Sequence, residues 1–118
     1  MEDSRKEALE RAGVNLNEAM ERFMGNEELL VRFLKKFVND SSYQSLVKAM
    51  GEKNAKDAFE AAHALKGVCG NLSIAKLFEQ VCRLVELLRG GNMGEEADQC
   101  FAEVVAEYER VIVELKNL

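Results

Sequence analysis

The single histidine of this 118-residue chain, His63, stands in a run whose side chains could support chemistry. Lys66 follows it by three residues, Gly67 by four and Gly70 by seven. On an α-helix these spacings place the four residues along one stripe, because residues three, four and seven apart lie on the same side. Each glycine inside a helix costs about 1 kcal/mol relative to alanine. Two glycines on the stripe of one histidine therefore indicate that another molecule must approach the imidazole closely.

An imidazole bordered by a lysine and by glycines suits a reversible covalent carrier. Imidazole titrates at about pH 6.5, so its nucleophilic neutral form is abundant at pH 7. It can also form a covalent intermediate and release it again. A phosphoryl group on a ring nitrogen adds about −1.5 to −2 charges, which the ammonium of Lys66 could partly neutralise. The chain has no P-loop, no kinase glycine-rich loop and no acidic cluster for Mg²⁺. The catalytic groups must therefore come from a partner.

Glycine and asparagine residues divide the chain into segments with helical periodicity. The apolar residues of 27–50 keep nearly the same phase on both sides of 40–42, which predicts one long helix, bent at most near Ser41 and stopped by Gly51. Asn15, Asn54 and Ser73 are expected to cap the helices that follow them. The expected helices cover residues 2–12, 15–25, 27–50, 54–71, 73–90 and 95–115.

These elements predict an all-α fold, an antiparallel up-down four-helix bundle with a short N-terminal helical arm. We expect a single domain over residues 1–118, with a core bundle at about 27–117 and the arm at about 2–25. The inward face of the helix at 54–71 should consist of small and apolar residues, namely Ala58, Ala62, Leu65, Cys69 and Leu72. His63 then points away from the core.

Composition narrows the class of protein. The net charge of −5 argues against a nucleic-acid partner. No stretch is apolar enough to span a membrane, and the polar start of the chain lacks an apolar signal core. We therefore expect a cytoplasmic monomer that does not bind membranes. The cysteines, Cys69, Cys82 and Cys100, show no CxxC spacing and are expected to be small core residues.

The run His63-Ala-Leu-Lys66-Gly67, followed by Val-Cys-Gly70-Asn-Leu, resembles the HxxKG signature of histidine phosphotransfer (HPt) domains. Residues 23–37 and 78–88 are similar to neighbouring helices of that family, so the resemblance covers residues 14–117. Family members often have Ser or Ala where this chain has Val68 and Cys69.

The resemblance implies a phosphorelay intermediate of two-component signal transduction. His63 would accept a phosphoryl group from an aspartyl phosphate on a receiver domain and pass it to another receiver. Lys66 would support the phosphohistidine, and Gly67, with Gly70 in the small-residue run, would give the receiver clearance. A hybrid sensor histidine kinase would be a further partner. The chain itself would be a non-catalytic phosphocarrier with no cofactor, because the receiver supplies Mg²⁺.

Several alternatives stay open from the sequence. Phe59 could be a core residue at the edge of the bundle or part of an apolar docking surface one turn before His63. Glu60 and His63 form a Glu-x-x-His pair, but a di-metal bundle needs a second such pair, and one histidine cannot supply it. A helical adaptor that is never phosphorylated is the remaining alternative function. The sequence does not place Lys76 or Arg89 relative to His63.

Overall fold

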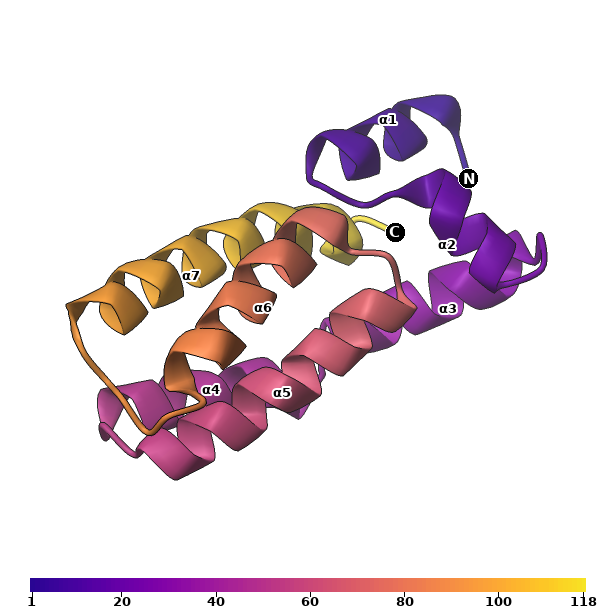
Figure 1. Cartoon of the computed structure of the whole chain (residues 1–118). Coiled ribbons are helices and arrows are strands. Elements are labelled where there is room, and N and C mark those ends of the chain that lie inside the picture. Colours follow the sequence, from indigo (N-terminus) through magenta and orange to yellow (C-terminus); the bar gives the residue numbers. More distant parts are fainter.

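The computed structural model describes residues 1–118 and contains seven α-helices and no strand (Figure 1). The helices are α1 (Asp3–Arg11), α2 (Leu16–Arg22), α3 (Glu27–Phe37), α4 (Ser41–Gly51), α5 (Ala55–Asn71), α6 (Ala75–Leu88) and α7 (Glu95–Lys116).

The last four helices form the predicted up-down bundle. Each packs against the next along the chain, so α5 lies between α4 and α6, and α7 packs on α6 (Figure 1). Tyr43 of α4 stacks on Tyr108 of α7 with ring centroids 3.5 Å apart, which brings the first and last helices of the bundle together. The all-α bundle fold is therefore confirmed.

The prediction of a single helix over residues 27–50 is wrong, because the helix is interrupted between Phe37 and Ser41. Val38 and Asn39 form a turn, and the Asp40 carboxylate accepts a hydrogen bond from the backbone N–H of Ser42 at 2.9 Å. Asp40 thus caps the start of α4. Gly51 is the last residue of α4 rather than a stop beyond it. The break lets α3 leave the bundle and extend toward α2 (Figure 1).

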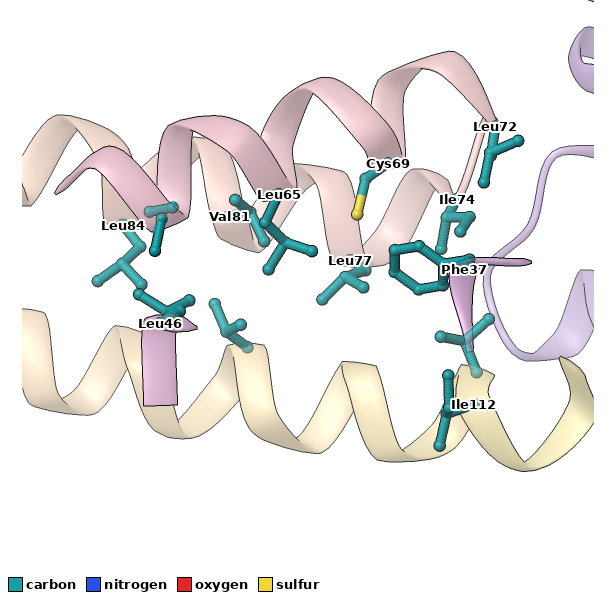
Figure 2. Packing of buried hydrophobic residues seen from close by; sticks show 14 of the residues in the cluster. Phe37, Leu46, Leu65, Cys69, Leu72, Ile74, Leu77, Val81, Leu84 and Ile112 are labelled. Atoms are coloured by element: carbon teal, nitrogen blue, oxygen red, sulfur yellow. The ribbon is translucent and has the colours of Figure 1, made fainter. Parts of the chain in front are cut away.

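One apolar core runs through the bundle. The inward face predicted for α5 is confirmed, since all five of its residues are buried in this core, and Ala61 joins them. Figure 2 shows Leu65 and Cys69 of α5 pointing into the interior beside Leu77 and Val81 of α6. Burial of this face fixes the rotation of α5, and that rotation decides which of its residues reach solvent.

The N-terminal arm, α1 with α2, packs against one end of the bundle (Figure 1). Leu9 is fully buried, although the sequence offered only a small apolar face here. Val14 pairs with Ile74 in an isolated antiparallel bridge, and the Asn15 N–H donates to the Ser73 carbonyl at 2.8 Å. The arm is thus attached to the turn between α5 and α6.

The caps agree with prediction in two of three places. Asn15 accepts from the Glu18 N–H and Asn54 from the Asp57 N–H, both at 3.1 Å. The predicted Ser73 cap is wrong, because Ile74 occupies the N-cap position of α6. Ser73 instead adopts a φ of 54°. Its hydroxyl donates a hydrogen bond at 3.0 Å to the carboxylate of Glu18, which belongs to the N-terminal arm and is distant in sequence.

Candidate functional site

α5 presents His63 to solvent near its middle. The side chains of Ala62 and Leu65 are buried in the core, and His63 lies on the opposite, exposed side of the helix. Lys66, expected to be mostly exposed, is only partly exposed. The helix is continuous from Ala55 to Asn71, so the backbone at the site is regular and held by core packing on both sides of His63.

The two glycines of the stripe have different surroundings. A Cβ atom built on Gly67 would have no neighbour within 4 Å, so this position opens directly to solvent. A Cβ atom on Gly70 would lie 3.0 Å from Cε1 of Phe78, which covers Gly70 from α6. The space beside Gly67 is therefore empty of this chain's own atoms, whereas Phe78 of α6 occupies the space beside Gly70.

A groove between α5 and the end of α6 lies beside His63 and has a volume of ≈ 780 Å³. The Phe59 ring packs against the imidazole with centroids 6.1 Å apart, and Cζ of Arg89 lies over the Phe59 ring at 5.3 Å from its centroid. Lys56 and Glu60 also line the groove. The structure thus brings a cation from a second helix to the histidine, with an aromatic ring in contact with both.

Glu86 holds this arginine through side-chain hydrogen bonds. Nη2 of Arg89 donates to Oε2 of Glu86 at 2.8 Å, and Nε donates to both carboxylate oxygens at 3.3 Å. These hydrogen bonds and the charge of Arg89 lower the pKa of Glu86, and the positive charge of Lys66 on α5 adds to the effect. Arg89 of the groove is therefore paired with a carboxylate that does not itself line the groove.

Not every residue considered from the sequence reaches the site. Arg89 does, but Lys76 lies at the other end of α6, where Gly13 approaches its side chain. Phe59 is partly buried and also lines the groove, so its two proposed roles are compatible. Glu86 was missed. Its i, i+3 spacing to Arg89 was the available signal, but such pairs are common on helix surfaces.

Two of the three cysteines, Cys69 and Cys100, are core residues as predicted. Burial raises the pKa of the Cys69 thiol, and burial likewise raises the pKa of Cys100. Both therefore remain protonated near pH 7 and pack as small apolar groups. The prediction is wrong for Cys82, which is partly exposed and lies outside the core, and all three cysteines are free.

No group of three or more His, Cys, Asp or Glu side chains is arranged to hold a metal ion. None of the helices combines the length and the apolar character that crossing a membrane requires.

Comparison with protein-family models matches residues 28–116 to the Hpt domain. No curated protein and no solved structure matched the chain. The matched range holds nearly all of α3, the whole bundle and His63, whereas α1 and α2 precede it. Hpt domains are phosphocarriers that act with receiver domains and histidine kinases in two-component phosphorelays. Because the match covers most of the chain, this protein belongs to the Hpt domain family.

Proposed function

We propose that His63 is the phosphoacceptor of this domain and carries a phosphoryl group between the aspartates of receiver domains. The observation that carries the proposal is the position of the chain's single histidine, exposed in the middle of α5 next to a glycine that opens to solvent. This placement allows a partner's active site to reach the imidazole without any rearrangement of the bundle.

In the proposed transfer a lone pair of the neutral imidazole attacks the phosphorus of the receiver's aspartyl phosphate. The bond between phosphorus and the aspartate oxygen breaks, and the aspartate leaves as a carboxylate. The ring, cationic after the attack, releases a proton to solvent. Transfer to a second receiver reverses these steps with a new carboxylate as nucleophile.

Lys66 supports the phosphorylated state in this proposal. It lies one turn from His63, and its ammonium would offset part of the added negative charge. Gly67 allows close approach, and Phe59 supplies apolar contact area at the edge of the interface. The partner provides Mg²⁺ and the acidic pocket, so the domain works as a monomeric carrier and not as an enzyme in its own right.

The proposal is tested by transfer of label from receiver domains phosphorylated with radiolabelled acetyl phosphate. We expect the wild-type chain to take label that survives base and is lost in acid, as phosphohistidine does. His63→Gln should take none. Far-UV circular dichroism of the variant should match that of the wild type, because an exposed position contributes little to stability.

Two outcomes would contradict the proposal. Label retained by His63→Gln would place the phosphoryl group elsewhere. A wild-type chain that binds phosphorylated receivers but never takes label would indicate a helical adaptor.

A further inference from the structure

Arg89, a cation on the wall of the His63 groove, is not free in the unphosphorylated protein. It donates three hydrogen bonds to the Glu86 carboxylate. A dianionic phosphoryl group on His63 would attract the same guanidinium. Glu86 and the phosphoryl group are therefore competitors for Arg89.

Glu86 has no evident role in the fold. Its side chain is 64% exposed, and its only hydrogen-bond partner is Arg89. It lies in the last turn of α6, where the negative end of the helix dipole disfavours a carboxylate. An exposed i, i+3 ion pair contributes little to stability, so Arg89 can exchange Glu86 for another anion at small cost.

The geometry allows Arg89 to make this exchange. Its guanidinium lies over the Phe59 ring, which also packs against the His63 ring, and Arg89 and His63 line the same groove. Arginine suits the role because its planar guanidinium can bind phosphate oxygens through two N–H groups. The Arg89 side chain is 56% exposed, so it is free to change rotamer within the groove.

We propose that Glu86 is a positioning residue that holds Arg89 away from His63 and so opposes phosphorylation of the histidine. When His63 is phosphorylated, Arg89 leaves Glu86 for the phosphoryl oxygens. The uncompensated Glu86 carboxylate keeps the phosphohistidine at higher free energy, which favours onward transfer. This inference rests on the proposed role of His63.

The test uses phosphoramidate, a small donor that needs no partner protein. Its P–N bond breaks as the bond from phosphorus to the imidazole nitrogen forms, and ammonia leaves. In mixtures of phosphoramidate and ammonium the phosphorylated fraction, measured by ³¹P NMR, reports the free energy of phosphohistidine. We expect Glu86→Gln to raise this equilibrium constant by about twofold to fivefold at low salt, with a smaller rise at high salt.

Glu103→Gln is the matched control. Glu103 is a similarly exposed carboxylate, but it pairs at 3.3 Å with Arg83, which, unlike Arg89, does not line the His63 groove. Glu103→Gln removes the same charge from the protein as Glu86→Gln does, and it should leave the equilibrium constant of phosphorylation unchanged. Arg89→Ala should lower the constant, and in that background Glu86→Gln should have much less effect.

The outcomes separate this inference from the proposed function. No phosphorylation of the wild-type histidine would reject both. Phosphorylation of the wild type with equal constants for Glu86→Gln and Glu103→Gln would reject the role of Glu86 alone. An unchanged effect of Glu86→Gln in the Arg89→Ala background would also reject it, because Glu86 would then not act through Arg89.

Discussion

Gly67 and Gly70 occupy one stripe of α5 but have different neighbours. Nothing of this chain lies near the missing side chain of Gly67, whereas Phe78 covers Gly70. A glycine retained in a regular helix despite its cost, with open space around it, is explained by what approaches from outside. A glycine under an aromatic ring is explained by packing.

This difference gives a prediction for Gly67. Gly67→Ala should stabilise the free domain by about 0.5–1 kcal/mol, because alanine is the better helix former and the site has room. Phosphotransfer from a receiver should slow, and Gly67→Gln should slow it further, since a displacement of about 1 Å can cost on the order of a hundredfold in rate. Thermal unfolding and single-turnover transfer measure the two effects.

Gly70→Ala serves as the control for stability. Its new Cβ would lie 3.0 Å from Cε1 of Phe78, so displacement of the ring should cancel the gain in helix propensity. Equal stabilisation at both positions would show that Phe78 moves freely. Undiminished transfer by Gly67→Gln would show that the partner does not approach over Gly67.

At the scale of elements, the break between α3 and α4 is the main departure from what periodicity predicted. No glycine or proline marks it, and the apolar residues continue in nearly one phase across it, so periodicity did not reveal it. The available signal was Asp40, a preferred N-cap residue, whose side chain accepts a hydrogen bond from the Ser42 N–H at the start of α4. By contrast, the bounds of α5 follow from local signals, since Asn54 caps its start and its inward face is continuous.

Asp40→Ala tests whether this cap maintains the break. We expect the free energy of unfolding to fall by about 1 kcal/mol, the usual cost of losing an N-cap side chain. The neighbouring exposed Asn39, which caps no helix, is the control, and Asn39→Ala should stay within about 0.5 kcal/mol of wild type. Chemical denaturation followed by circular dichroism measures both. A more stable and more helical Asp40→Ala variant would mean that the chain favours one continuous helix.

At the scale of the whole molecule, the sequence did not predict the contacts between segments that are distant along the chain. The arm precedes the range matched by the family, yet it is joined to the α5–α6 turn through Val14, Asn15 and Glu18. Arg89 reaches the groove of His63 only because α6 packs antiparallel to α5. Helical periodicity places residues on faces of their own helix, but it does not say which residue of a neighbouring helix will lie opposite them.

Gly13 reports on how tightly the arm is attached. It has a φ of 102°, and a Cβ there would lie 2.7 Å from Cβ of Lys76 on α6. Gly13→Ala should therefore destabilise the protein by roughly 2–4 kcal/mol, from backbone strain together with the clash. Gly25 has a similar φ of 79° but open space around it, so Gly25→Ala should lose only the stability that backbone strain costs. Equal loss of stability in thermal unfolding of the two variants would show that the arm yields without cost.

The exposed position of His63 on a regular helix also bears on the lifetime of the phosphorylated state. A phosphoryl group there would be open to water as well as to a receiver, because His63 is exposed and Gly67 leaves space beside it. Hydrolysis and transfer would then compete, and neither would require a movement of the chain. Receivers would collect the phosphoryl group only where they are abundant enough for transfer to be faster than hydrolysis.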